Sequence, residues 1–187
     1  MTAWPRDTVR TREAILRAAE KLIAVKGFQS LTLDEVAAGA SVIKGGLLHH
    51  FPSKQALILG LAEHLIAEHA AEIRETMKQD PEGPGAFTRA FLQAHLACTD
   101  ECPQVCAALT AESRNIPAML ELFQQFSTQC QQFIENDGLD PVTATIVRYA
   151  AEGLMQASMS GMPRPANFEA TIAQLLEMAG KSRQKLS

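Results

Sequence analysis

The stretch TLDEVAAGASVIKGGLLHHFPSK, residues 32–54, decides the fold that this sequence predicts. It opens with Thr32 and Glu35, whose T-x-x-E spacing is the capping box typical of a helix start. Glycine and serine interrupt the helical pattern at residues 39–41, and a second short helix follows until Pro52 ends it. Two short helices joined by a tight turn are the layout of a helix-turn-helix, so we predict that unit here.

The same stretch resembles the DNA-reading element of the TetR family of bacterial repressors, whose pattern runs T-x-x-x-I/V-A-x-x-A-G-V-S-x-G-x-L/I-Y-x-Y/H-F-x-S/N-K. Compared without gaps, the chain matches this pattern at Thr32, Val36, Ala37, Ala40, Val42, Gly45, Leu47, His50, Phe51, Ser53 and Lys54. Another register, which sets residues 38–41 on A-G-V-S, needs compensating gaps, so we prefer the gap-free one. The resemblance in motif covers the N-terminal part of the chain and implies a DNA-binding transcriptional regulator.

Three positions depart from the family pattern. Ser41 stands where the family has its turn glycine, Ile43 where it has the serine that caps the second helix, and Leu48 where it has a tyrosine that commonly touches a phosphate. If the turn requires a left-handed residue, a non-glycine side chain costs about 1–2 kcal/mol there. We expect Ser41 to cap the second helix one turn early in place of Ile43.

Composition indicates a helical protein with a basic N-terminal part. Of the 187 residues, 47% are hydrophobic, which suffices for a packed core. We find no signal peptide and no apolar run near the ~20 residues of a membrane span, so we expect a cytoplasmic protein without membrane contact. The net charge is −4, but residues 1–54 hold eight Lys/Arg against five Asp/Glu, and residues 55–187 hold nine against sixteen. This asymmetry predicts nucleic-acid contact at one end of the chain.

Apolar residues recur at three-to-four spacing along most of the chain, which predicts an all-α fold of about nine helices. We expect an N-terminal three-helix helix-turn-helix domain at residues 1–54 and a helical ligand-binding and dimerisation domain at residues 55–187. Gly27 is expected to end the first helix, and Asp140 to cap the eighth. Breaks are expected at residues 80–85, 99–103, 136–141 and 162–167. The expected helices outside the quoted stretch are residues 8–25, 54–79, 87–97, 105–113, 115–136, 142–161 and 168–179.

The polar face of the second short helix carries the candidate DNA contacts. Lysine and histidine donate hydrogen bonds to bases or phosphates, and glycine lets the backbone approach the groove. The expected set is Lys44, Gly46 and His49 for base edges, Thr32, His50 and Lys54 for phosphates, and Gly45 for close approach of the backbone. Arg6, Arg10 and Arg12 near the N-terminus either add salt-sensitive affinity or belong to a solvated tail, and both interpretations stay open.

For the rest of the chain the resemblance implies a ligand cavity and a dimer interface. The candidate ligand-binding set is Phe87, Phe91, Met119, Phe123, Phe126, Glu152, Met155, Gln156 and Met159. An acidic residue such as Glu152 in a pocket favours a cationic ligand. The last two long helices are rich in small residues, which allow close helix packing, and in the family the corresponding pair forms a four-helix dimer interface.

The resulting hypothesis is a homodimeric, TetR-like repressor. A single recognition helix reads few bases, so two copies are expected to enter successive major grooves, roughly 34–36 Å apart, on a near-palindromic double-stranded DNA operator. A small apolar effector then releases the protein from its operator, which requires a coupling free energy of about 1–3 kcal/mol. No cofactor is expected.

The cysteines leave a second hypothesis open, in which the repressor responds to thiol oxidation or to a metal. Cys98, Cys102 and Cys106 lie at four-residue spacing and would share one face of an unbroken helix, whereas Cys130 stands apart. Pro103 argues against an unbroken helix.

The histidines and the remaining motifs give weaker signals. His64 and His69 lack the spacing of helical metal ligands, so we expect a solvated helix face there, and His95 gives no stronger indication of a metal. A small-molecule-binding protein or an enzyme is the least favoured alternative, because the sequence contains no catalytic motif.

Overall fold

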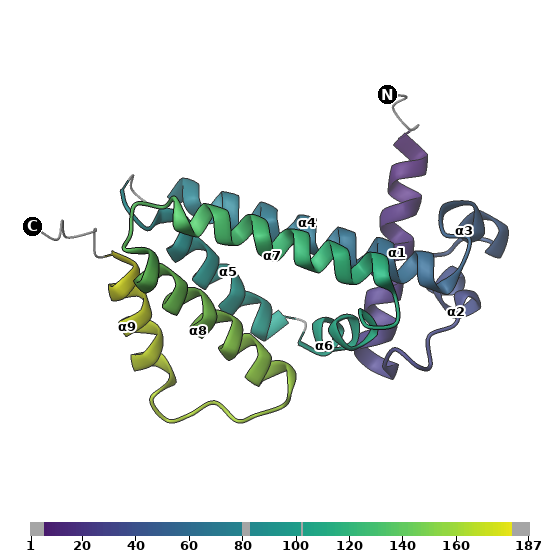
Figure 1. Ribbon diagram of the computed structural model, residues 1–187. Coiled ribbons are helices and arrows are strands. Elements are labelled where there is room, and N and C mark those ends of the chain that lie inside the picture. Colours follow the sequence, from purple (N-terminus) through teal and green to yellow (C-terminus); the bar gives the residue numbers. More distant parts are fainter. Residues whose placement is uncertain (1–5, 80–82, 102, 181–187) are drawn as a thin grey trace, which may run out of the picture. The chain divides into compact units, whose positions relative to one another are not determined.

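The computed structural model describes the backbone of residues 6–79, 83–101 and 103–180, and the side chains of these residues except 6–7 and 98–101. The described residues form nine helices and no strand (Figure 1), which confirms the all-α prediction. None of these helices combines the length and the apolar character that a membrane span requires. In chain order the helices are α1 (Arg6–Lys26), α2 (Leu33–Gly39), α3 (Lys44–His50), α4 (Lys54–Gln79), α5 (Ala86–Glu101), α6 (Pro103–Glu112), α7 (Pro117–Glu135), α8 (Pro141–Met159) and α9 (Phe168–Gly180).

Local signals in the sequence set the ends of several helices. Thr32 caps α2, because its Oγ1 accepts a hydrogen bond from the backbone N–H three residues later at 3.3 Å. Asp140 caps α8 in the same way at 2.9 Å, and Pro141 occupies the first position, where a missing N–H does no harm. Gly27 follows α1 with a φ of 78°. These three helix ends confirm the predictions made for them.

The break predicted at residues 99–103 is wrong in its extent. α5 continues to Glu101, and α6 begins at Pro103. Proline is tolerated in the first turn of a helix, so Pro103 begins α6. Cys98 and Cys106 therefore lie on different helices, as Pro103 indicated, while Cys102 lies outside the described residues.

Backbone contacts divide the chain into two compact units, which we describe separately. The N-terminal unit comprises residues 1–66 and 104–122, and the C-terminal unit comprises residues 67–103 and 123–187. α4 and α7 contribute residues to both units. The domain boundary that we expect between residues 54 and 55 falls at the start of α4 and stays a prediction.

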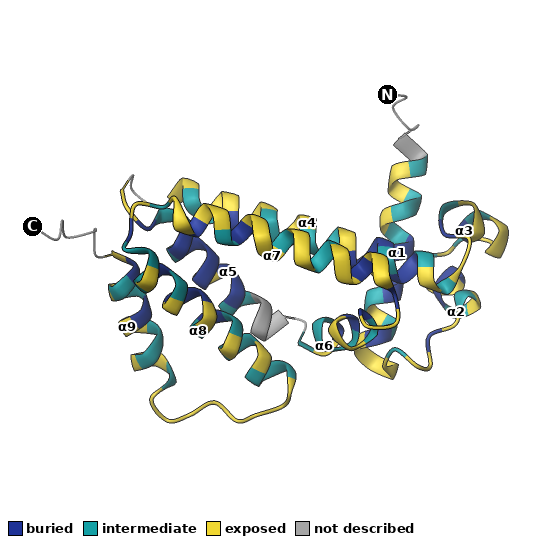
Figure 2. Cartoon of the chain, viewed as in Figure 1, coloured by how far each residue is buried: buried dark blue, intermediate teal, exposed yellow. Residues whose placement is uncertain are grey.

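In the N-terminal unit, α1 packs against both α2 and α3, and α2 packs against α3. Apolar residues of these helices and of the first half of α4 form the core. Figure 2 shows buried positions on α1 and at the start of α4. Fully buried side chains of this unit include Ile15, Leu16, Ile23, Val36, Leu47, Leu57, Ile58, Leu61 and Met119.

In the C-terminal unit, α5 packs along α8, and α9 covers both (Figure 1). Figure 2 shows that buried residues gather on α5 and on one side of α8. The core cluster of this unit consists of Ile73, Ala90, Phe91, Leu92, Ala94, Cys130, Ile134, Leu139, Ala144, Val147, Ala151, Leu175 and Ala179.

A joint at the start of α5 ties together three segments of the C-terminal unit that are distant in sequence. The Gly85 N–H donates to the Asp137 carbonyl at 2.7 Å. The Asp137 carboxylate accepts from two backbone N–H groups in the first turn of α5, at 3.0 and 2.7 Å, and so caps this helix from the α7–α8 turn. Nη1 of Arg89 donates to the Ala179 carbonyl, at the end of α9, at 2.9 Å.

Candidate functional site

The helix-turn-helix predicted at residues 32–54 is formed by α2, a tight turn and α3. Ser41 in the turn has a φ of 57°, a left-handed conformation at the position of the family's turn glycine. A non-glycine residue in this conformation costs about 1–2 kcal/mol. The Val42 N–H donates to the Ala37 carbonyl across the turn at 3.0 Å. The turn therefore keeps a geometry that favours glycine although serine occupies it.

α3 begins without a side-chain cap. Its N-cap residue is Ile43, and no side-chain hydrogen bond satisfies the first turn. The expectation that Ser41 caps this helix is wrong, because Ser41 lies in the left-handed turn, two residues before the N-cap position. Burial of Leu47 and Phe51 in the core holds α3 in place instead.

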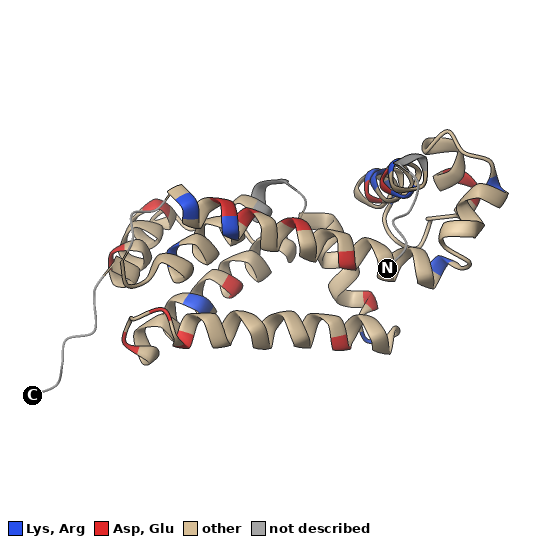
Figure 3. Cartoon of the chain, turned by 90° about the horizontal axis from the view of Figure 1, so that it is seen from above, with Lys and Arg blue, Asp and Glu red and all other residues tan. Residues whose placement is uncertain are grey.

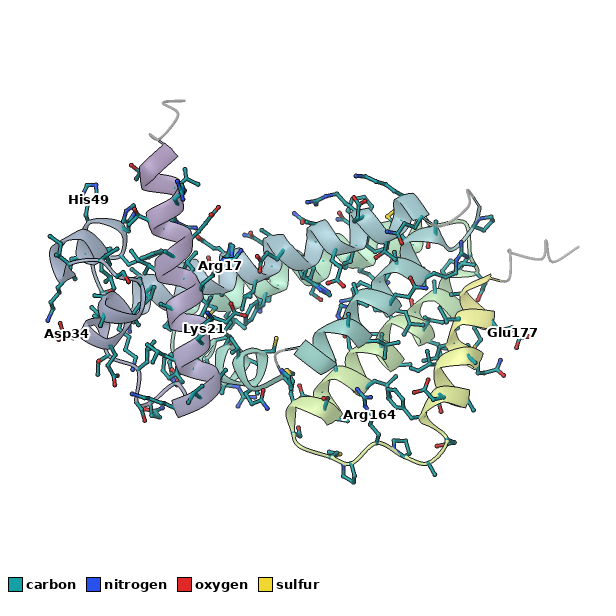
Figure 4. All side chains as sticks on the ribbon, turned by 180° about the vertical axis from the view of Figure 1, so that it is seen from behind. Arg17, Lys21, Asp34, His49, Arg164 and Glu177 are labelled. Carbon is teal, nitrogen blue, oxygen red and sulfur yellow. The ribbon has the colours of Figure 1, made fainter. Side chains whose placement is uncertain are left out.

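Most of the surface of α3 away from Leu47 is open to solvent. Lys44, Gly45 and His49 are exposed, and His49 projects away from the helix in Figure 4. A Cβ atom built on Gly45 would meet no atom within 4 Å, so another molecule can approach the backbone closely here. The second helix of a helix-turn-helix is the one that enters the major groove.

Lys44 forms an ion pair with Asp34 that the sequence analysis missed. Its Nζ lies 2.9 Å from Oδ1 of Asp34 in the first turn of α2, and both side chains are exposed. Lys26 and Glu35 pair similarly at 2.6 Å, and the hydrogen bond from Lys26 is the main cause that lowers the pKa of Glu35. No sequence signal links Lys44 with Asp34, because the two residues lie on different helices and the turn between them determines their distance.

Two of the three expected phosphate contacts, Thr32 and Lys54, already form hydrogen bonds within the unit. The Thr32 hydroxyl accepts the hydrogen bond that caps α2. His50 is half-buried, and burial is the main cause that lowers its pKa. Nζ of Lys54 donates to the Phe28 carbonyl at 3.1 Å and lies 4.7 Å from the centre of the Phe28 ring. The structure places the three residues in the helix-turn-helix, and their contact with phosphates stays a prediction.

The basic residues near the N-terminus belong to α1, which Figure 3 shows end-on with both basic and acidic positions. Arg10 and Arg12 are therefore helical, whereas the side chain of Arg6 lies outside the described part of the chain. The Arg12 guanidinium carbon lies 5.3 Å from the centre of the Phe51 ring, and Nη2 lies 3.6 Å from Oε2 of Glu63. Arg12 thus contacts the residue that follows α3.

The C-terminal unit brings part of the expected ligand-binding set together. The rings of Phe87 and Phe91 stack with their centres 6.3 Å apart, and Phe133 stacks on Phe87 at 5.1 Å. Phe126 packs against the same core cluster. These aromatic side chains come from α5 and α7.

Other members of the set are spread more widely. Phe123, Met155 and Met159 are half-buried, and Gln156 is exposed. Met119 is fully buried in the N-terminal unit, so the structure does not group it with the residues of the C-terminal unit. Ligand binding by these residues stays a prediction.

Two histidines that the sequence analysis set aside form a pair inside the C-terminal unit. Nε2 of His69 lies 3.1 Å from Nδ1 of His95, and the same Nδ1 lies 3.1 Å from the Phe91 carbonyl. Because a carbonyl only accepts, Nδ1 of His95 carries the proton in this arrangement and His69 accepts. The centre of the His95 ring lies 3.8 Å from that of Phe91.

Burial favours the neutral form of both rings, because it lowers the pKa of each. It lowers the pKa of His95 to about 3 and also lowers the pKa of His69. The prediction that His69 faces solvent is therefore wrong. A signal was present in the sequence, because His69 lies four residues from both Leu65 and Ile73, within the apolar stripe of α4.

Arg148 is a second buried polar residue that the sequence analysis missed. It is 4% exposed, and its Nε donates to Oε1 of Glu152 at 2.9 Å. Its two terminal nitrogens donate to Gln131 and Ser127 on α7. The charge of Glu152, which we expected to favour a cationic ligand, is thus already balanced by Arg148.

Cys130 is poorly placed for oxidation sensing. Burial raises the pKa of Cys130 to about 11, which keeps the thiol protonated and weakly nucleophilic at pH 7. Cys106 is half-buried on α6, and the side chains of Cys98 and Cys102 lie outside the described residues. Among the described side chains, no group of three or more His, Cys, Asp or Glu residues is arranged to hold a metal ion.

Comparisons with solved structures match the whole architecture. A TetR transcription regulator from Haloarcula marismortui superposes with a TM-score of 0.73 at 18% identity, covering 94% of this chain and 100% of that chain. A TetR-family transcriptional regulator from Rhodococcus sp. gives a TM-score of 0.70 at 17% identity, covering 92% and 100%. At these identities the likeness concerns the fold.

Sequence comparisons match both parts of the chain. The HTH-type transcriptional regulator EthR of Mycolicibacterium smegmatis is 26% identical over 110 residues, which span 59% of this chain and about half of that protein, 51%. The nucleoid occlusion factor SlmA of Photobacterium profundum is 25% identical over 170 residues, 84% of this chain and 86% of that protein. Residues 15–61 match the bacterial regulatory proteins of the tetR family, and residues 85–180 match the tetracyclin repressor-like C-terminal domain. The chain therefore belongs to the TetR family of helix-turn-helix transcriptional regulators.

Proposed function

We propose that this protein is a homodimeric repressor that binds a near-palindromic DNA operator and leaves it when a small molecule binds the C-terminal unit. The observation that carries the proposal is the solvent-open face of α3 on a helix-turn-helix anchored by Leu47 and Phe51. Lys44, Gly46 and His49 are the proposed base-edge residues. The proposed phosphate contacts are Thr32, His50 and Lys54, with Gly45 allowing close approach of the backbone.

Replacing Lys44 with alanine tests the DNA-reading surface. Loss of a lysine contact to a base edge is expected to weaken operator binding by about 1–3 kcal/mol, which is roughly 5- to 150-fold. The measurement is fluorescence anisotropy with DNA from the region upstream of the protein's own gene, at low and high salt, with scrambled DNA alongside. Lys78→Ala is the matched control, because it removes the same charge from an exposed side chain in the C-terminal unit. Equal weakening by both substitutions, or equal binding of scrambled DNA by the wild type, would contradict the proposal.

An apolar face on α8 supports dimerisation. Val142, Ile146 and Tyr149 lie at four- and three-residue spacing on this helix and are 67%, 51% and 61% exposed. Gly153 continues the row, and a Cβ built there would meet no atom within 4 Å. Large apolar side chains aligned on one helix face are typical of an interface. A second copy is the occupant that we propose, because two reading helices require a two-fold dimer.

Replacing Ile146 with glutamate is expected to convert the dimer to monomers. A two-fold interface buries the new charge twice, and an uncompensated buried charge costs about 3–5 kcal/mol, so the dimer dissociation constant should rise more than about a hundred-fold. Analytical ultracentrifugation across a concentration series measures this shift. Val25→Glu is the control, because Val25 is 82% exposed on α1 in the N-terminal unit and is expected to leave the dimer unchanged. A dimer that survives Ile146→Glu would place the interface elsewhere.

The polar and aromatic interior of the C-terminal unit supports effector binding there. Phe87, Phe91 and Phe126 supply apolar contacts, while the His69–His95 pair and the Arg148 cluster supply hydrogen-bonding groups. The multidrug binding protein EbrR, solved with malachite green, shares this fold with a TM-score of 0.65 at 20% identity. An apolar molecule with one polar group is the effector class that suits these side chains. Release of labelled operator DNA by members of a small-molecule collection tests this part of the proposal.

A further inference from the structure

The start of α3 presents an apolar side chain to solvent where a helix usually has a polar cap. Ile43 is 81% exposed and makes no capping hydrogen bond. Isoleucine is among the least favoured residues at an N-cap, so helix stability does not account for it. Burial does not account for it either. The side chain is therefore available to contact another molecule at this place.

The neighbours of Ile43 leave its methyl groups unobstructed. Its Cγ1 lies over Gly46, 3.7 Å from the position of a Cβ built there, and Gly45 has open space in place of a side chain. Lys44 is held by Asp34 on α2. Within residues 43–46, Ile43 thus contributes the exposed apolar surface.

The first residues of a recognition helix contact base edges in the major groove. Among the groups that bases present there, the C5-methyl of thymine is the one that apolar side chains recognise. We propose that Ile43 determines specificity by packing on the 5-methyl group of a thymine in each operator half-site. This inference rests on the proposed DNA-binding function and adds to it a base and the residue that reads it.

The test removes the methyl group without changing any hydrogen-bonding edge. A duplex is first selected from a random pool by the full-length wild-type protein. Each thymine of the duplex is then replaced by deoxyuridine, and binding is measured by fluorescence anisotropy. Replacement at one position in a half-site is expected to weaken binding about four-fold, which corresponds to one methyl removed from an apolar contact. Replacement in both half-sites is expected to give about sixteen-fold, because separated contacts add.

Two variants assign the effect to a residue. Ile43→Ala should bind the thymine and deoxyuridine duplexes equally, whereas Leu48→Ala, which shortens the neighbouring exposed apolar side chain of α3, should keep the wild-type difference. Because Ile43 is exposed, the alanine variant is expected to keep the unfolding midpoint of the wild type.

Three results would overturn the inference: a wild type that ignores every deoxyuridine replacement, a difference that persists in Ile43→Ala, or a difference that disappears in Leu48→Ala instead. Failure of the selection to enrich any duplex is a separate outcome. It would overturn the proposed function itself, and the inference with it.

Discussion

Replacing Gly85 with alanine is expected to destabilise the C-terminal unit by about 2–5 kcal/mol, through backbone strain and steric overlap together. Gly85 has a φ of 88°, and a Cβ built on it would lie 1.9 Å from the Ala179 carbonyl oxygen. Neither the end of α9 nor the start of α5 can move away without breaking hydrogen bonds of the joint, which Asp137 and Arg89 hold together. Urea unfolding, followed by circular dichroism, measures the loss.

Gly83→Ala is the matched control for this substitution. Gly83 lies two residues earlier in the same loop, has no left-handed φ, and offers open space around a built Cβ. Its free energy of unfolding is expected to stay within about 0.5 kcal/mol of the wild-type value, as for ordinary surface substitutions. If the two variants unfold at the same urea concentration, the close packing at Gly85 does not contribute to the stability of the C-terminal unit.

Mild acid is expected to destabilise the protein through His95. Its pKa is about 3 in the folded chain, against 6.5 for a solvated histidine, because burial opposes the charged ring. The unfolded chain therefore gains a proton below pH 6.5 that the folded chain does not gain until about pH 3. The stabilisation is complete above pH 6.5 and is lost as the pH falls toward 3, and between pH 7 and 5 the loss is about 2 kcal/mol. The depressed pKa of His69 acts in the same direction.

The variant His95→Phe separates this effect from other titrations. Phenylalanine keeps a ring beside Phe91 and removes the ionisable group, so the free energy of unfolding is expected to change less between pH 7 and 5 than in the wild type. Measuring above pH 5 keeps most carboxylates ionised. The quantity compared is the slope of unfolding free energy against pH, so a different stability at pH 7 does not affect the conclusion. Equal slopes would show that His95 does not control the acid response.

Most of the fold could be predicted, because its signals are local. The capping box at Thr32, Gly27 at the end of α1 and Asp140 before Pro141 each act within one turn of the residue that carries them. The predicted break between α5 and α6 is too wide, because the polar residues 99–101 continue α5 and Pro103 begins α6. Sequence alone does not distinguish a helix end from a helix that continues with polar residues.

The sequence predicts the interior of the C-terminal unit less well, because residue type is a poor guide to exposure there. His69, His95 and Arg148 are polar residues on apolar faces with hydrogen-bonding partners; His95 and Arg148 are buried, and His69 is half-buried. Their positions in the apolar repeat gave the better signal. Met119 is expected in the ligand-binding set because methionine suits an apolar pocket. It lies in the N-terminal unit, apart from the rest of that set.

The helix-turn-helix has a consequence for how the protein searches a genome. Residues 32–54 hold two lysines and two acidic residues, and Lys44 and Glu35 are already in ion pairs. Affinity for arbitrary DNA grows with the number of phosphates that cations neutralise. A reading element with balanced charge therefore adds little affinity for incorrect sites. Occupancy of the right site in a genome follows the ratio of the affinity for the operator to the affinity for incorrect sites, and internal pairing of charges raises that ratio without strengthening any contact to the operator.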